Sequence, residues 1–197
     1  MVVAVTRDGF LIGAIGLSDP LRPESKAVIA HLRKVGVKRI ALVTGDKDST
    51  AQEVAASVGI TEIYSHVSAQ DKLDITQNLM STSKGTVIVV GDGINDAPAL
   101  AMAHVGVAMG ARGATAASEA ADVVIVEDSI GHLVEAIEIA QVSRRKAIQA
   151  AAIGMSLSFI VMLAGAAGIS TASEGALAQE FIDVIAILWA LSALSDK

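Results

Sequence analysis

The chain has 197 residues, of which 52% are hydrophobic, and its mean hydropathy is +0.57. This apolar content is too high for an ordinary soluble domain of this length, so a membrane-embedded part is expected. The sequence contains no cysteine, which excludes disulfides and thiolate metal sites, and its net charge of -6 with scattered lysines and arginines argues against nucleic-acid binding.

The amino-terminal segment predicts a β-hairpin followed by a helix. Residues 2–5 and 10–17 are apolar runs on either side of Arg7-Asp8-Gly9, a sequence typical of a tight turn. Next, Pro23 opens a segment in which apolar residues recur at helical spacing, and Gly36 ends it.

Short apolar strands alternate with helical segments in the following hundred residues. Strands are expected near residues 39–43, 60–64, 86–90, 105–109 and 122–126, and helices near residues 49–58, 68–80, 96–103 and 115–120. This alternation predicts an α/β fold with a parallel sheet and flanking helices.

The ten residues 91–100, GDGINDAPAL, directly follow the apolar strand at residues 86–90. Ligands bind at the carboxyl ends of parallel strands, so Asp92 and Asp96 are candidate ligands for Mg²⁺. Asn95 can hydrogen-bond an oxyanion, while Gly91 and Gly93 allow close backbone approach. The alternative is an ordinary Asp/Asn/Gly turn.

A second strand ends in a similar corner, formed by Thr44, Gly45 and Asp46. Between the two corners, a Ser-x-x-Asp capping sequence at Ser68 predicts a helix start with Lys72 in its first turn. The helix dipole disfavours a cation there, so a nearby anion is expected. The alternative for Lys72 is a solvated helix lysine.

The carboxy-terminal third predicts two membrane spans. Residues 147–169 carry no charge and are long enough to cross about 30 Å of hydrocarbon as a helix. A helix beginning near Ile130 is expected to continue through Arg144 into this span, and residues 170–174 connect it to a second span at residues 175–194. The basic triplet at residues 144–146 places that end of the span, and the α/β domain, in the cytoplasm.

The sequence LVTGD, then Lys72, then GDGINDAPAL, in this order and spacing, resembles the second half of the phosphorylation domain of P-type ATPases, a branch of the haloacid dehalogenase-like fold. The match extends upstream to Asp19 and downstream to Asp128. The resemblance implies terminal strands linked to a nucleotide-binding region at residues 1–17, an incomplete phosphorylation domain at 18–143 and a two-helix transmembrane hairpin at 144–197.

In this family an aspartate of a DKTGT motif attacks the γ-phosphate of ATP and forms an acyl phosphate. The resemblance implies that Thr44, Gly45 and Asp46 hold the phosphoryl oxygens and position the hydrolytic water. It further implies that Lys72 neutralises the developing charge. ATP is therefore the implied substrate, and phosphoryl transfer is the implied chemistry.

The resemblance also implies a Mg²⁺ cofactor. Asp92 would ligate the ion, while Asn95 and Asp96 would order the site, with Asp96 as a second candidate ligand. The 197 residues contain neither DKTGT nor DxDxT. The chain is therefore expected to be the carboxy-terminal part of a pump that needs its missing amino-terminal portion, and to be inactive when isolated.

Two other interpretations stay open. A soluble haloacid dehalogenase-like phosphatase would share the strand-end corners, but it would need its own nucleophilic aspartate and would have no membrane hairpin. A truncated, non-catalytic, membrane-anchored regulatory or interaction protein accounts for the absence of the nucleophile.

The arrangement of two spans after the phosphorylation domain resembles that of the heavy-metal-transporting branch of this family. The resemblance implies a multi-pass protein of a prokaryotic plasma membrane. Glu180 and Asp183 lie on one face of the final span, and carboxylates inside a membrane mark an ion pathway. Oxygen ligands favour Zn²⁺, Cd²⁺, Co²⁺ or Mn²⁺ over Cu(I) as the exported ion. Alternatively, Glu180 reaches the membrane interface by snorkelling.

Overall fold

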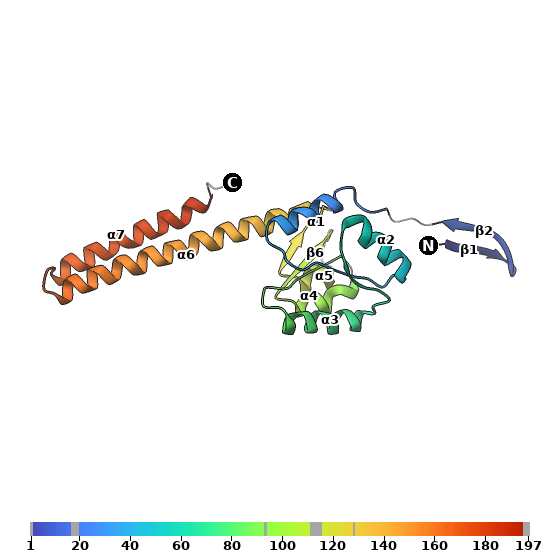
Figure 1. Ribbon diagram of the computed structural model, residues 1–197, viewed down its shortest axis with the longest axis horizontal. Helices are drawn as coiled ribbons and strands as arrows, with labels where there is room; N and C mark the ends of the chain where they lie inside the picture. The colour runs from blue at the N-terminus through green and yellow to red at the C-terminus, as the bar shows by residue number, and fades with distance from the viewer. Residues whose placement is uncertain (1, 17–19, 93, 111–115, 128, 195–197) are drawn as a thin grey trace. The chain divides into compact units, whose positions relative to one another are not determined.

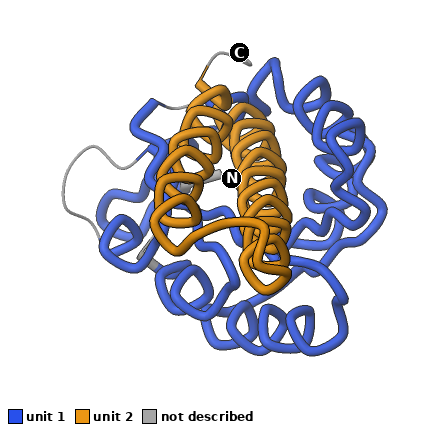
Figure 2. Tube along the Cα trace, turned by 90° about the vertical axis from the view of Figure 1, so that its left-hand side faces the viewer, with its two compact units in different colours: residues 1–131 blue, residues 132–197 orange. Residues whose placement is uncertain are grey.

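The computed structural model describes residues 2–16, 20–92, 94–110, 116–127 and 129–194. Five residues named above, Leu17, Asp19, Gly93, Thr115 and Asp128, lie outside the described residues. The chain divides into two compact units, residues 1–131 and residues 132–197 (Figure 2).

The first unit opens with the antiparallel hairpin of β1 (Val2–Arg7) and β2 (Phe10–Gly16), as predicted. Its turn uses left-handed backbone at Asp8 (φ 52°) and Gly9 (φ 85°), the conformation that two-residue hairpin turns require.

Helices and strands then alternate as expected (Figure 1). The strands are β3 (Ala41–Val43), β4 (Glu62–Tyr64), β5 (Ile88–Gly91), β6 (Val105–Met109) and β7 (Val123–Ile125). The helices are α1 (Ser25–Lys34), α2 (Asp48–Val58), α3 (Ala69–Thr82), the 3₁₀ turn η1 (Ile94–Asp96), α4 (Ala97–Met102) and α5 (Ala116–Ala120).

The parallel strands form two sheets where a single sheet was expected. β3 pairs with β4, and β5, β6 and β7 pair in that order, all in parallel. β3 and β5 are therefore both edge strands among the described residues. Each of them ends at one of the Gly-Asp corners, because Thr44 follows β3 and Asp92 follows β5.

A small apolar core holds α4 against the three-stranded sheet. Leu100 on α4, Ala108 on β6 and Ala117 on α5 are almost completely buried and pack together. Gly106 on β6 allows this close packing, because a Cβ atom there would lie 2.4 Å from the carbonyl oxygen of Leu100. α4 directly follows η1 and contains the end of GDGINDAPAL. This core therefore positions the second corner, which follows β5; the first corner follows β3.

We expect Gly106→Ala to destabilise the first unit by about 1–3 kcal/mol, because the added methyl group forces α4 away from β6. The measurement is the free energy of opening from hydrogen exchange of the β6 amides. Gly85→Ala is the matched control, since a Cβ atom at Gly85 would meet nothing within 4 Å. Equal opening free energies in the two variants would contradict the assigned close contact.

The second unit consists of two long helices that run side by side (Figures 1 and 2). Helix α6 (Gly131–Ala166) continues through Arg144 as predicted, and α7 (Ala172–Leu191) ends in the 3₁₀ turn η2 (Ser192–Leu194). Both helices are long and apolar enough to cross a membrane. Close approach is possible where Gly154 of α6 faces Ala186 of α7.

The second helix begins three residues earlier than the predicted span. Thr171 and Glu174 form a reciprocal capping box, in which the Glu174 N–H donates to Thr171 Oγ1 and the Thr171 N–H donates to Glu174 Oε2. The span was predicted from hydropathy alone, which excludes these polar residues. The capping box instead places Thr171 at the N-cap of the helix and Glu174 in its first turn.

Candidate functional site

The first corner is closed by hydrogen bonds between its own residues. Thr44 Oγ1 donates to Asp46 Oδ2 at 2.9 Å, and the Asp46 N–H donates to Thr44 Oγ1 at 3.1 Å. Thr44 is half-buried, while Gly45 and Asp46 are exposed. The two polar side chains and the backbone at Gly45 thus form a small, pre-arranged polar surface at the end of β3.

The loop after β4 crosses this corner. The Thr44 N–H donates to the Tyr64 carbonyl, the Val67 N–H donates to the Thr44 carbonyl, and the His66 N–H donates to the Asp46 carbonyl. His66 adopts a left-handed conformation (φ 54°), which is uncommon for residues other than glycine, although asparagine, aspartate and histidine adopt it more often than the rest. Nothing in the sequence around His66 marks a left-handed position, so this residue could not be predicted as part of the corner.

This loop leads directly into the capping box that begins α3. The Asp71 N–H donates to Ser68 Oγ at 3.2 Å, and the Ser68 N–H donates to Asp71 Oδ2 at 2.8 Å. Ser68 Oγ also donates to Asp71 Oδ2 at 2.6 Å, and this hydrogen bond, followed by the one from the Ser68 N–H, holds the pKa of the Asp71 carboxyl below its usual value. The predicted helix start is confirmed, and it fixes Lys72 in the first turn.

The start of α3 is expected to loosen in acid. Because the pKa of Asp71 is lowered in the folded chain, its capping contribution is present above the ordinary aspartate pKa of about 4 and is lost as the pH falls below that value. The measurement is hydrogen exchange of the first-turn amides of α3, corrected for intrinsic rates. In the control Asp71→Asn this acid-induced loosening should disappear, and its persistence there would assign it to another group.

Lys72 connects the first corner to the second. Its Nζ donates to Asp96 Oδ1 at 2.6 Å, and the two side chains are only 22% and 15% exposed. The anion expected beside this lysine is thus the Asp96 carboxylate. Gly91 makes room for that carboxylate, because a Cβ atom at Gly91 would lie 2.8 Å from Asp96 Oδ2.

Asp92 and Asn95 precede Asp96 in the chain, and both are exposed. In the described part of the chain, no group of three or more His, Cys, Asp or Glu side chains could hold a metal ion. Two candidate carboxylates, those of Asp92 and Asp96, are present at this corner. This fits Mg²⁺, which usually keeps several waters and binds through one or two carboxylates together with substrate phosphates.

A family model matches the part of the chain that carries these parallel strands, strand-end aspartates and the lysine. The model of haloacid dehalogenase-like hydrolases matches residues 2–104. The chain belongs to this hydrolase family. The fold class predicted from the sequence, parallel strands with flanking helices followed by two long apolar helices, is confirmed.

Known relatives of this haloacid dehalogenase-like chain are cation-transporting ATPases. A probable cation-transporting ATPase G of Mycobacterium tuberculosis (strain H37Rv) is 40% identical over 94% of this chain and 24% of its own length. A cadmium, zinc and cobalt-transporting ATPase of Bacillus subtilis is 35% identical over 100% of this chain and 28% of its own length. The chain thus spans about a quarter of the length of these curated relatives.

A solved structure matches both units. The crystal structure of a zinc-transporting PIB-type ATPase in the E2.Pi state has a TM-score of 0.84 and 31% identity to this chain. The match covers 98% of this chain and 31% of the pump. Similarity to the heavy-metal P-type ATPases therefore extends through the two apolar helices.

The haloacid dehalogenase-like unit is followed by a polar cluster between those two helices. Ser158 Oγ on α6 donates to Gln179 Oε1 on α7 at 3.0 Å, and Gln179 Nε2 donates to Asp183 Oδ1 at 3.0 Å. Glu180 forms no hydrogen bond or ion pair with a described residue. The structure therefore distinguishes the two candidate carboxylates, because only that of Asp183 is linked to the facing helix.

Ser158 and Gln179 were not among the predicted site residues. Gln179 precedes Asp183 by one helical turn, so the i, i+4 spacing could have suggested this pair. Ser158 could not have been chosen from the sequence, because its partner lies on another helix and the helix register is not visible in composition.

Proposed function

We propose that this chain is the carboxy-terminal part of an ATP-driven heavy-metal pump. In that pump, phosphoryl transfer through an aspartyl phosphate drives the export of a divalent cation. The observation that carries the proposal is the Lys72–Asp96 ion pair at the end of β5, in a chain with two helices long enough to cross a membrane. Similarity to metal-transporting ATPases along almost the whole chain supports it.

The strand-end residues would act on the phosphoryl group by position and charge. Thr44 and the backbone at Gly45 would donate hydrogen bonds to the phosphoryl oxygens, and the Asp46 carboxylate would accept one from the hydrolytic water. Lys72 would place its positive charge beside the same oxygens while Asp96 keeps its ammonium group in position.

Asp92 would hold Mg²⁺, with Asp96 and Asn95 ordering the site around it. When bound, the ion would neutralise negative charge on the phosphoryl oxygens. Asn95 is exposed beside this position and can hydrogen-bond an oxyanion without adding charge.

The nucleophile would come from a segment outside these 197 residues, since they contain no DKTGT motif. β3 and β5, the two strands that end at the corners, each have one edge that pairs with no other described strand. A parallel strand paired there would bring its own carboxyl end beside Asp46 or Asp92. This geometry suits an aspartate that attacks ATP at the point where the two corners act.

We expect the isolated chain neither to hydrolyse ATP nor to incorporate the γ-phosphate, whereas the complete pump does both. The measurement is acid-stable, hydroxylamine-labile labelling with γ-labelled ATP in the presence of each candidate metal. A labelled phosphoprotein formed by this chain alone would refute the assignment of the nucleophile to another segment.

The absence of a DKTGT motif also supports a second candidate, a non-catalytic, membrane-anchored regulatory protein. Genomic sequence upstream of the codon for Met1 separates the two. A continuous reading frame that encodes DKTGT and a nucleotide-binding domain supports the pump, while a stop codon supports the regulatory protein.

For the ion pathway, we propose that Asp183 is the principal carboxylate and that Glu180 is secondary. Asp183 is tied through Gln179 to Ser158, so three oxygen-bearing side chains from two helices lie together. A carboxylate ligand held in this way suits divalent ions such as Zn²⁺, Cd²⁺, Co²⁺ and Mn²⁺ better than Cu(I).

The proposed membrane is the plasma membrane of a prokaryote, with the phosphorylation domain in the cytoplasm. The basic residues 144–146 precede the uncharged run at 147–169, and such residues favour the cytoplasmic side. ATP, on whose phosphoryl group the first unit would act, is available on that side.

A further inference from the structure

One end of the α6–α7 hairpin carries a positive cluster that the proposed pumping reaction does not use. Lys146 Nζ on α6 donates to Ser192 Oγ at 3.0 Å and lies 5.4 Å from the centroid of the Trp189 ring. Trp189 Nε1 donates to Gln149 Oε1 at 3.3 Å. Both helices therefore contribute to a fixed arrangement of a cation and an indole.

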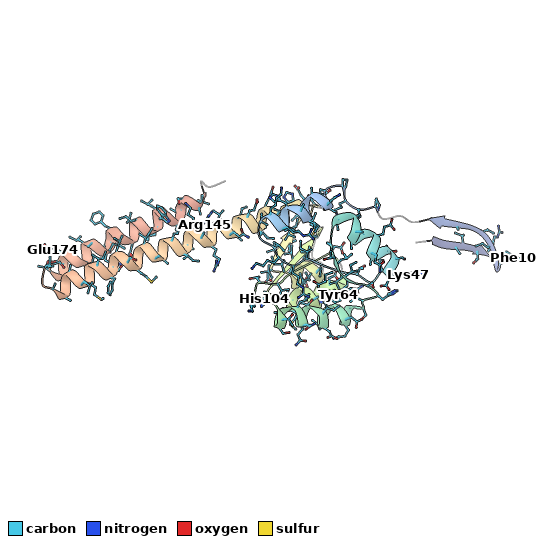
Figure 3. The ribbon with its side chains drawn as sticks, viewed as in Figure 1. Phe10, Lys47, Tyr64, His104, Arg145 and Glu174 are labelled. Carbon is cyan, nitrogen blue, oxygen red and sulfur yellow. The ribbon has the colours of Figure 1, made fainter. Side chains whose placement is uncertain are left out.

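These contacts and the negative end of the α7 dipole stabilise the positive charge of Lys146. The charges of the two preceding arginines are not stabilised in this way. Arg144 and Arg145 are exposed and form no hydrogen bond or ion pair with a described residue. Arg145 lies on α6 beside the carboxyl end of α7 (Figure 3).

No carboxylate balances this charge nearby on the two helices. Residues 139–150 of α6 and residues 184–194 of α7 and η2 contain no Asp or Glu. Beside Lys146, the charges of Arg144 and Arg145 therefore stand at this end of the hairpin without an acidic residue in these two described segments. Such a cluster attracts an anion.

The position of the cluster indicates which kind of anion it would bind. The triplet immediately precedes the uncharged run at residues 147–169, at the depth where hydrocarbon gives way to headgroups. Lipid phosphates are concentrated at that depth, a tryptophan ring is stable there, and the planar arginine fork matches phosphate oxygens.

We propose that this end of the hairpin binds the headgroup phosphate of an anionic phospholipid. Arg144 and Arg145 contact the phosphate, while Lys146 and Trp189 form the positioned surface beside it. The proposal goes beyond the proposed pump and requires only that the two apolar helices lie in a membrane.

The test uses the whole chain in vesicles made of equal parts of phosphatidylcholine and phosphatidylglycerol. Trp189 is the single tryptophan of the sequence, so its fluorescence reports on this site alone. Two vesicle preparations are compared, with bromine on the chains of only the neutral or only the anionic lipid. We expect the brominated anionic lipid to quench more strongly, with an enrichment of about fivefold for each arginine that binds a headgroup.

The double variant Arg144→Gln/Arg145→Gln should remove this difference, and Arg144→Lys/Arg145→Lys should retain part of it. The matched control is Lys26→Gln/Lys34→Gln, which removes the same charge from exposed positions on α1 and should retain the full difference. Far-UV circular dichroism of each variant checks that the helices are intact.

Several results would overturn the proposal. Equal quenching by the two brominated lipids in the unaltered chain would show no headgroup preference, and no quenching by either would place Trp189 outside the membrane. A preference that survives the double glutamine variant would exclude the arginines. Loss of the preference on adding inorganic phosphate, but not chloride at equal ionic strength, would identify a free-phosphate site.

Discussion

Asp92→Ala in the complete pump is expected to lower ATP hydrolysis at saturating Mg²⁺ by at least about a hundredfold. Asp92 directly follows β5 and is exposed at the corner where Lys72 and Asp96 pair. Its loss would remove one of the two carboxylates proposed to bind Mg²⁺ while leaving the ion pair intact. The effect should therefore fall on the chemical step and not on folding.

Two variants make this test specific. Asp74→Ala removes an exposed aspartate from α3, outside the corner, and should leave the hydrolysis rate nearly unchanged. Asp92→Asn keeps an oxygen ligand without the charge and should give an intermediate rate that rises with Mg²⁺ concentration. Near-normal turnover by Asp92→Ala at saturating Mg²⁺ would remove Asp92 from the metal site.

The strand-end corners could be predicted because they depend on local sequence. An apolar strand that stops at Gly-Asp has few alternatives, and the spacing from Ser68 to Asp71 specifies a helix start by itself. The anion expected beside Lys72 followed from the helix dipole alone, and the structure supplies it as Asp96.

The features that sequence analysis missed depend on contacts between distant segments. The division of the parallel strands into two sheets follows from which edges pair, and apolar periodicity does not encode pairing. His66 acquires its left-handed backbone where the loop after β4 hydrogen-bonds to Asp46. Likewise, Ser158 meets Gln179 only once the register of α6 against α7 is set.

The hairpin shows a further limit of hydropathy as a guide. A window of apolar residues locates a span but gives equal weight to each carboxylate within it. In the structure, Asp183 accepts a hydrogen bond from Gln179, while Glu180 has no such bond to a described residue. Substitutions of Asp183 and of Glu180 are therefore expected to affect transport differently.

Asp183→Ala in the complete pump is expected to abolish metal-stimulated ATP hydrolysis while nucleotide binding stays intact. A carboxylate in a membrane span is costly unless it has a partner or a cation to bind, and Asp183 is tied across the two helices through Gln179 and Ser158. Removing it would leave the Gln179 amide without this acceptor and the proposed ion pathway without its principal carboxylate.

Glu180→Ala is the matched control, because it removes an equal charge one turn away on the same helix and should reduce stimulation far less. The measurement is the hydrolysis rate against Zn²⁺, Cd²⁺, Co²⁺, Mn²⁺ and Cu(I) for both variants and for Asp183→Asn. Undiminished divalent stimulation in Asp183→Ala would make Asp183 a packing residue, and stimulation of the unaltered pump by Cu(I) alone would refute the divalent assignment.

If the cross-helix hydrogen bonds position Asp183 for the ion, Ser158→Ala should weaken the apparent affinity for the stimulating metal without changing the maximal rate, because Ser158 acts only by holding Gln179 in place.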